Sequence, residues 1–242
     1  MILYANGDSH TAAAEAVVPE CFALDDGRHG IDRRPHPQNL AASWCTHVAR
    51  ELNMHLVCDA ESGGSNARIL RTTREWLAQN QHQIPHVLMI IQWTTWEREE
   101  WFHRDVWYQV NASGVDWVPE SLLERYKLYI TEIDWPKCTV HAHDQIWQFH
   151  QELAAQGVRH VFFNGYSDFA AIADRRAWGR YYMYPYAKNG TYYNWLTKKG
   201  APLASSASAH FGVEGHRLWA EHVLQYIYRN QILMFTDEIS SD

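Results

Sequence analysis

Short apolar runs alternate along the chain with longer segments in which apolar residues recur every three or four positions. Four runs have the length and composition of buried strands: residues 2–5, 56–58, 87–91 and 158–163. Helical spacing of apolar residues predicts helices over 40–52, 69–77, 146–154 and 219–227. Strands that alternate with helices are typical of a parallel sheet with crossover helices. The pattern therefore predicts an α/β fold.

The remaining segments show no clear strand or helix periodicity, apart from one further expected strand. Residues 12–38 contain prolines, glycines and charges, and they predict an irregular segment over the rim of the sheet. A fifth strand is expected around residues 181–184. The length of 242 residues fits one domain over 1–235, with an aromatic-rich insertion at about 93–118 and a polar tail over 236–242.

Candidate chemistry begins directly after the first predicted strand, with Gly7-Asp8-Ser9-His10. Open α/β sheets bind ligands in the crevice at the carboxyl ends of their strands, so the Ser9 hydroxyl is expected at that crevice. Gly7 allows a sharp turn and a close approach of the backbone to a ligand. Gly, Asp and Ser are also common turn formers, so an ordinary strand-to-loop turn is the alternative.

A histidine near the other end of the chain complements Ser9. His210 lies just before the last predicted helix, on the segment that leads into it. A serine nucleophile needs a general base within hydrogen-bond reach, and histidine is the usual base because its pKa lies near neutrality. Together, the strand-end serine and the histidine before the closing helix predict a nucleophile and its base.

Four blocks of the sequence resemble the SGNH/GDSL hydrolase family. Residues 6–11 (Asn-Gly-Asp-Ser-His-Thr) are similar to its first block, and residues 210–220 to its last. Residues 61–66 lie where the family has its oxyanion glycine, and residues 89–94 where it has Gly-x-Asn. The resemblance implies a three-layer α/β/α sandwich around a central parallel sheet, the flavodoxin-like SGNH fold.

The resemblance also assigns roles to residues of this chain. It implies that Ser9 is the nucleophile, that His210 is the base, and that the N–H groups of Ser9 and Gly64 form the oxyanion hole. Asn66 and Thr94 are expected to contribute to the same hole. The residues expected to contact substrate are Asp8, His10, Gly63, Trp93, Trp96 and Arg98.

The chain departs from the family pattern at two positions. Ala207 stands where the acidic partner of the histidine is usual, and Thr94 stands where an asparagine is usual. We therefore expect His210 to be oriented by a backbone carbonyl, by a hydroxyl of Ser205, Ser206 or Ser208, or by a carboxylate from elsewhere in the chain. We also expect Ser9 Oγ within or near hydrogen-bond distance of a His210 ring nitrogen.

These features predict a serine esterase that hydrolyses small acyl esters, acetyl above all, on a carbohydrate, by a Ser-His dyad. The alternative is a catalytically weak or inactive SGNH-fold protein that binds glycans or forms part of a virion. Ala207 and Thr94 motivate this alternative, and residues 93–98 (Trp-Thr-Thr-Trp-Glu-Arg) resemble SGNH-like proteins carried by bacteriophages. Reaction of Ser9 with an organophosphonate distinguishes the two hypotheses.

The stretch over residues 93–117 is rich in aromatic residues and interleaved with charges. Flat amphipathic rings beside charged groups are suited to stacking on sugars. Large aromatic residues also bury most of their area in proteins, so a hydrophobic subcore under a long loop is an equal alternative.

Charge and composition limit the classes of partner that the protein is expected to bind. A formal net charge of −7 argues against binding to nucleic acids or anionic membranes, since both need basic patches. No apolar run approaches the length of a bilayer span. Met1 leads directly into the first strand, so we expect a cytoplasmic protein, or a virion-associated one if a phage encodes it.

Metal and cofactor sites are not expected. His141, His143 and Asp144 are close in sequence, but the chain does not mark out the further ligands that a transition-metal site needs. The prediction is therefore an enzyme or binding protein without metal or cofactor.

Overall fold

The computed structural model describes residues 1–26, 32–112, 114 and 118–234. Its main sheet is parallel and has the strand order β2-β1-β3-β6. The strands are β1 (Ile2–Asn6), β2 (His55–Cys58), β3 (Val87–Trp93) and β6 (Arg159–Asn164). The four expected strands of a parallel sheet are confirmed, each within two residues of the predicted ends.

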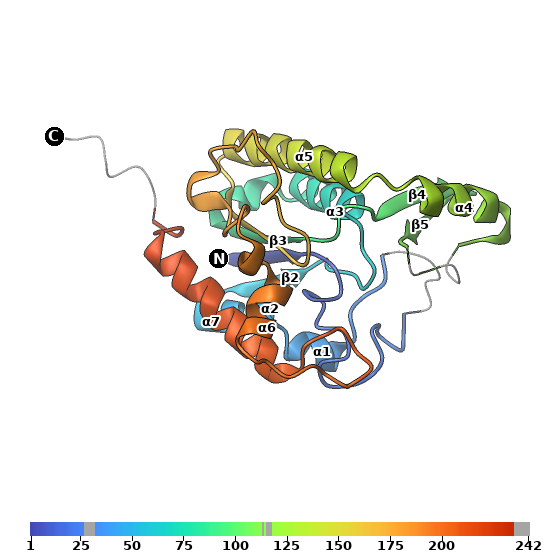
Figure 1. Ribbon diagram of the computed structural model, residues 1–242. Helices are drawn as coiled ribbons and strands as arrows, with labels where there is room; N and C mark the ends of the chain where they lie inside the picture. The colour runs from blue at the N-terminus through green and yellow to red at the C-terminus, as the bar shows by residue number, and fades with distance from the viewer. Residues whose placement is uncertain (27–31, 113, 115–117, 235–242) are drawn as a thin grey trace.

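Helices connect these strands (Figure 1). The α-helices are α1 (Pro37–Ala41), α2 (Trp44–Glu51), α3 (Asn66–Gln79), α4 (Leu123–Glu132), α5 (Trp135–Ala155), α6 (Tyr192–Lys198) and α7 (Val213–Arg229). Short 3-10 helices are η1 (Gln81–His86), η3 (Glu120–Leu122), η4 (Gly179–Tyr181) and η5 (Lys188–Gly190). In the part of the chain that the structure describes, no helix is both long and apolar enough to cross a bilayer.

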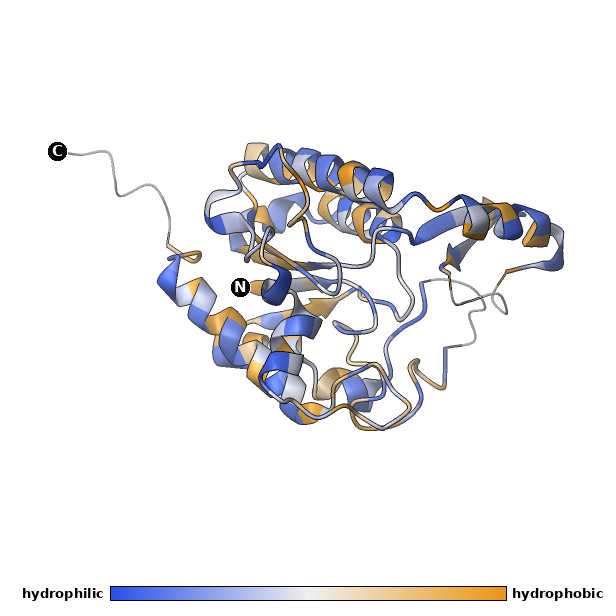
Figure 2. Cartoon of the chain, in the orientation of Figure 1, coloured by the Kyte–Doolittle hydropathy of each residue, from blue (hydrophilic) through white to orange (hydrophobic). Residues whose placement is uncertain are grey.

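Helices pack on both faces of the sheet, because successive residues of a strand point to opposite faces. On one face, Leu88 and Ile90 pack with buried residues of α2, α6 and α7. On the other face, Met89 and Ile91 pack with buried residues of α3 and α5. In the resulting α/β fold every residue of β3 is buried. The apolar residues of the sheet lie in the interior of the molecule, between the helices (Figure 2).

Two local predictions differ from the structure. The fifth strand expected around 181–184 is wrong: η4 ends at Tyr181, and Tyr182 forms only an isolated parallel bridge to Phe162. The helix expected over 40–52 is two helices, α1 and α2. Ser43 separates them, because its side chain accepts a hydrogen bond from Thr46 N–H and so starts a new helix.

The expected insertion forms an arm that projects from the body of the molecule (Figure 1). It contains a separate antiparallel hairpin of β4 (Glu99–His103) and β5 (Val106–Val110), followed by η3 and α4. Trp101 packs there with Val110, Val118 and Tyr126 in a small core of its own. Trp117 and the tail over 236–242 lie outside the described residues.

The strand order brings the candidate residues together. The chain passes from β1 to β2 on one side and then returns to β3 on the other side of β1, so the order reverses between β1 and β3. Ligands of open α/β sheets bind at the carboxyl ends of the strands at such a reversal. Asn6 pairs with Ile91 at these ends, so the segments that follow β1 and β3 leave the sheet side by side.

Thr11 and Gln92 pack tightly against Gly7 at this edge of the sheet. A larger residue at position 7 tests this packing. A Cβ atom at Gly7 would lie 2.5 Å from Thr11 Oγ1 and 2.9 Å from Gln92 Cβ. We expect Gly7→Ala to lower the free energy of unfolding by about 1–3 kcal/mol through overpacking. Urea denaturation measures this change. Gly212→Ala is the matched control, since no atom lies within 3.8 Å of the Cβ position there and the expected change is within about 0.5 kcal/mol. Equal urea midpoints for the two variants would contradict the close packing at Gly7.

Candidate active site

Ser9 lies in a tight turn directly after β1. The N–H groups of Thr11 and Ala12 both donate to the Asp8 carbonyl at 3.0 Å, which folds the chain back at the edge of the sheet. Ser9 is 6% exposed, and its hydroxyl has no hydrogen-bond partner among the described residues. A hydroxyl without a structural partner at the carboxyl end of a strand is free to take a chemical role.

Asp8 fixes this turn to the end of β3. Its Oδ1 accepts from His10 N–H at 2.9 Å and from Gln92 Nε2 at 2.7 Å. Its Oδ2 accepts from Thr94 Oγ1 at 2.6 Å and pairs with an Arg98 guanidinium nitrogen at 3.3 Å. Burial opposes ionisation, but His10, Arg98 and these donors lower the pKa of Asp8. Both oxygens are engaged within the protein, so Asp8 holds the site together rather than facing a substrate.

A carboxylate from a distant part of the chain orients His210. Glu15 Oε2 lies 3.0 Å from His210 Nδ1. The Ser208 hydroxyl also donates to Glu15 Oε2 and lies 3.4 Å from the same ring nitrogen. Ser208 Oγ further accepts from His210 N–H at 2.9 Å. The expectation that a serine of this run or a distant carboxylate replaces the acid missing at Ala207 is confirmed, and both contribute.

Glu15 is ionised over a wide pH range. Its partial burial opposes ionisation, but the hydrogen bonds from Ser208 and His210 outweigh that effect and hold the pKa of Glu15 below its ordinary value. A carboxylate that accepts from Nδ1 also sets the tautomer of the His210 ring, with the proton on Nδ1 and the lone pair on Nε2. With Glu15 on Nδ1, Nε2 of His210 is the nitrogen available as a base.

The described hydrogen bonds include none between Ser9 and His210. Their closest described connection is His10, the residue after Ser9, whose ring centroid lies 5.3 Å from that of His210. Hydrogen bonds between catalytic groups are often long in unliganded enzymes and shorten when substrate binds. The expected contact between Ser9 Oγ and His210 therefore stays a prediction, and the described residues place His210 beside His10, the neighbour of Ser9.

His10 is a buried wall of this site. It is 2% exposed, and its ring packs at 4.9 Å centroid distance against both Tyr166 and Tyr192. Its Nδ1 has no hydrogen-bond partner among the described residues. Burial lowers the pKa of His10 to about 4, against the opposing effect of Asp8. A neutral His10 beside His210 adds no positive charge that would disfavour an imidazolium there.

The groups expected to form the oxyanion hole differ in the hydrogen bonds that they already make within the protein. The Gly64 N–H donates to the Glu61 carbonyl at 2.9 Å, so this donor is engaged within its own turn. Asn66 Oδ1 accepts from Thr94 N–H at 2.9 Å, and its Nδ2 makes only long contacts of 3.4 and 3.5 Å with the Thr94 and Thr95 carbonyls. The Ser9 N–H has no partner among the described hydrogen bonds. Ser9 N–H and Asn66 Nδ2 are therefore the donors that remain available.

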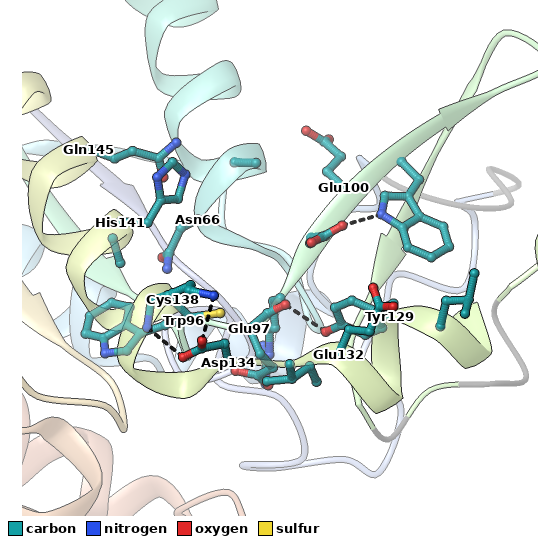
Figure 3. A pocket seen from close by; sticks show the side chains of 18 of the residues that line it. Asn66, Trp96, Glu97, Glu100, Tyr129, Glu132, Asp134, Cys138, His141 and Gln145 are labelled. Carbon is teal, nitrogen blue, oxygen red and sulfur yellow. Dashed lines mark hydrogen bonds and ion pairs between the residues drawn. The ribbon is translucent and has the colours of Figure 1, made fainter. Parts of the chain in front are cut away.

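The residues expected to contact substrate are divided between the core and the surface. Trp93 is fully buried in the core against Phe149 and Phe162, which leaves it no surface for a ligand. Gly63 has φ +83° in the turn before α3, and nothing lies within 4 Å of its Cβ position. Trp96 and Arg98 line a separate cavity of about 770 Å³ beneath the arm (Figure 3). Arg98 connects this cavity to the turn that contains Ser9, because it lines the cavity and its guanidinium pairs with Asp8.

Sequence reasoning did not identify Glu15 or Tyr166, and it named Ser208 as one of three serines that could orient His210. Glu15 is the one acid in a run of alanines over 12–16, which was a usable signal, although nothing local links it to a residue 195 positions away. It occupies a left-handed backbone conformation with φ +64°. Tyr166 follows β6 by two residues, and the carboxyl end of a strand was the available signal there.

No metal site is found in the described part of the chain: no three His, Cys, Asp or Glu side chains come together as ligands there. His143 instead contacts the Tyr186 hydroxyl at 3.0 Å through Nε2, and its ring packs against Phe169.

Buried neutral histidines make stability depend on pH. Burial lowers the pKa of His10 and His160 to about 4 and that of His216 to about 3, each from an ordinary value of 6.5. Between pH 6.5 and 4 the unfolded chain therefore binds more protons than the folded one, so stability is complete above pH 6.5 and is lost as pH falls. We expect the urea midpoint to drop between pH 7 and 4.5, because the free energy of unfolding falls by on the order of 1–3 kcal/mol per histidine.

His216→Gln is the matched variant for this measurement. Its side-chain oxygen can still accept from Trp44 N–H, which donates to His216 Nδ1 at 3.3 Å, but it does not titrate. The variant should show a shallower fall than the wild type. An equal urea midpoint at pH 7 and pH 4.5 in the wild type would contradict the burial of neutral imidazoles.

Comparison with known families places most of the chain in one group. The model of DUF6071, a family of unknown function, matches residues 32–178, and the chain belongs to this family. The matched region contains β2, β3, β6 and the arm, whereas Ser9, Glu15 and His210 lie outside it. No curated protein matches the chain.

Proposed function

We propose that this member of the DUF6071 family is a serine ester hydrolase of SGNH type that acts on small acyl esters, acetyl above all. The observation that carries the proposal is the contact of 3.0 Å between Glu15 Oε2 and His210 Nδ1, with the His210 ring packed beside His10, the residue after the strand-end Ser9. Orientation of a histidine by a carboxylate on Nδ1 is the arrangement that makes Nε2 a base for a serine hydroxyl.

The fold supports the same proposal. A parallel sheet of order β2-β1-β3-β6 with helices on both faces is compatible with the three-layer, flavodoxin-like SGNH sandwich. Ser9 follows β1 at the reversal of strand order, and His210 precedes the closing helix α7. These are the places that the resemblance to the SGNH/GDSL family implies for nucleophile and base.

In the proposed reaction, Ser9 Oγ attacks the ester carbonyl carbon while His210 Nε2 takes the hydroxyl proton. The tetrahedral oxyanion accepts hydrogen bonds from Ser9 N–H and Asn66 Nδ2. Its collapse breaks the bond to the leaving alcohol, which receives the proton from His210. Water then attacks the acyl-serine by the same steps, releases the acid and restores Ser9.

Glu15 stabilises the imidazolium that forms twice in this cycle. An ionised carboxylate on Nδ1 does so far better than a neutral acceptor. The lowered pKa of Glu15 favours the charged carboxylate that this role needs. The residues needed for turnover are thus Ser9, His210 and Glu15, and no metal or cofactor takes part in the proposed steps.

Turnover of p-nitrophenyl acetate tests the proposal. We expect release of p-nitrophenol above the buffer rate, faster for the acetyl than for the octanoyl ester, because the proposed substrates carry small acyl groups. Acetylated sugars then test the carbohydrate part by release of acetate. The alternative, a glycan-binding or virion protein of the same fold, predicts no turnover of any of these esters, and that result would favour it.

A further inference from the structure

A large cavity lies where the arm meets the body of the molecule. It has a volume of about 770 Å³, within the range of small-molecule sites. The segment that leads into β4, one side of α4 and the start of α5 enclose it (Figure 3). Neither Ser9 nor His210 lines it, but Asn66 and Arg98 do, so the cavity adjoins the proposed ester site without containing its nucleophile or base.

Aromatic rings form part of its wall. Trp96 is stacked on Phe169 at 4.7 Å, which holds its ring in place. Tyr129 donates its hydroxyl to the Glu97 carbonyl at 2.7 Å. The guanidinium of Arg125 lies 4.0 Å from the ring centroid of Trp101. This last contact is a cation–π interaction, and it shows that the wall already accepts a cation on an aromatic face.

The wall carries more carboxylate charge than its own basic residues neutralise. Asp134 pairs with Lys137 at 3.0 Å, and Glu100 pairs with Arg71 at 2.6 Å. By contrast, the cavity residues Glu97, Glu99 and Glu132 have no basic partner in the described part of the chain. The lining holds five carboxylates against the three cationic side chains Arg98, Arg125 and Lys137, so carboxylate charge is in surplus and the cavity is attractive to a cation.

Glu97 has an incomplete set of hydrogen bonds. It is 8% exposed, and its Oε1 accepts from Thr95 Oγ1 at 3.0 Å. Its Oε2 is buried and has no donor among the described residues. Buried carboxylate oxygens are normally hydrogen-bonded, and an unmet one is costly. A bound ligand that brings an N–H donor would complete this group.

Two neighbouring groups report the negative potential of the cavity. The pKa of the Cys138 thiol is raised, first by burial and then by the charges of Glu97, Asp134 and Glu99. The pKa of Tyr129 is raised by burial and by Glu97 and Glu99. Both shifts have the sign that a surplus of carboxylate charge produces.

We infer that this cavity binds a small organic cation, with a primary ammonium group that hydrogen-bonds to Glu97 and Glu99 and a body that packs between Trp96 and Tyr129. Ammonium groups supply the donors that Glu97 lacks, and charge-assisted hydrogen bonds of this kind are about twice as strong as neutral ones. The aromatic wall favours an organic cation over a hydrated metal ion, because the ring faces attract cations that present a less hydrated surface.

Isothermal titration calorimetry with matched amine and neutral compounds tests this inference. The probes are 1,5-diaminopentane against 1,5-pentanediol, and D-glucosamine against D-glucose. We expect at least one amine to bind the intact protein at least tenfold more tightly than its neutral match. We also expect Glu97→Gln, which keeps the acceptor for Thr95, to weaken that binding by about tenfold.

The matched control is Glu124→Gln, since Glu124 lies on the same helix α4 as part of the wall but pairs with Lys127 on the surface. It should leave binding unchanged, and so should Ser9→Ala, because the site does not depend on ester hydrolysis. Glu99→Gln, at the second carboxylate of the proposed site and on an exposed position, gives a second test if Glu97→Gln does not fold. Absence of amine binding, equal binding of amine and neutral match, or equal loss in Glu97→Gln and Glu124→Gln would overturn the inference.

Discussion

Ser9→Ala and His210→Ala should each lower kcat/KM for p-nitrophenyl acetate by at least about 10³-fold. Ser9 supplies the attacking oxygen, and His210 supplies the base that removes its proton. Because the two residues act in one step, the double variant should be little slower than either single variant. Initial rates at several substrate concentrations measure these effects.

The matched control for this series is Ser206→Ala, an exposed serine in the same run as Ser208. It should retain wild-type turnover. Circular dichroism and the urea midpoint of each variant separate lost chemistry from lost folding. Turnover that survives Ser9→Ala in a folded protein would show that another group is the nucleophile.

Glu15→Gln should lower kcat by about 10²–10⁴-fold with little change in KM. Glutamine fits the same space and can still contact His210, but it carries no charge to stabilise the imidazolium in the transition state. It can also present an N–H group to Nδ1, which would favour the wrong ring tautomer. A fall in kcat without a rise in KM is the sign of an interaction made only in the transition state.

Two comparisons make the test of Glu15 specific. Ala207→Asp should not raise turnover in the wild type, because Glu15 already occupies Nδ1 of His210. The difference in kcat between the wild type and Glu15→Gln should stay constant between pH 7 and 8, since the pKa of Glu15 is lowered and its stabilising charge is lost only as pH falls through that lowered pKa. An unchanged kcat in Glu15→Gln would mean that the carboxylate is structural.

The sequence predicted those parts of the fold that depend on periodicity. The strands over 2–6, 55–58, 87–93 and 159–164 are apolar runs between turn residues, and all four were expected. The strand expected around 181–184 failed because Tyr181 ends η4, Tyr182 makes one isolated bridge to β6, and Tyr184 packs against α7. The hairpin of β4 and β5 was not expected, since charges and aromatic residues alternate there without a clear apolar face.

The candidate site could be predicted only in part, because the sequence marks residues beside regular elements but not residues in irregular loops. Ser9 and His210 each stand beside a regular element, and this local context marked them. Glu15 has no such context: it reaches His210 through an irregular loop with a left-handed residue, and tertiary structure alone brings them together. The Gly64 N–H was expected to be free, but whether a turn amide is engaged by its own turn depends on geometry that residue types do not specify.

Labelling with an alkyl fluorophosphonate tests the central claim, that Ser9 is a nucleophile activated by His210, most directly. The reagent forms a bond to an activated serine oxygen with loss of fluoride, and intact mass followed by peptide mapping locates the adduct. We predict one adduct per chain, on Ser9, formed far more slowly in His210→Ala and absent in Ser9→Ala. An unlabelled wild-type protein, or an adduct that persists in folded Ser9→Ala, would contradict the account.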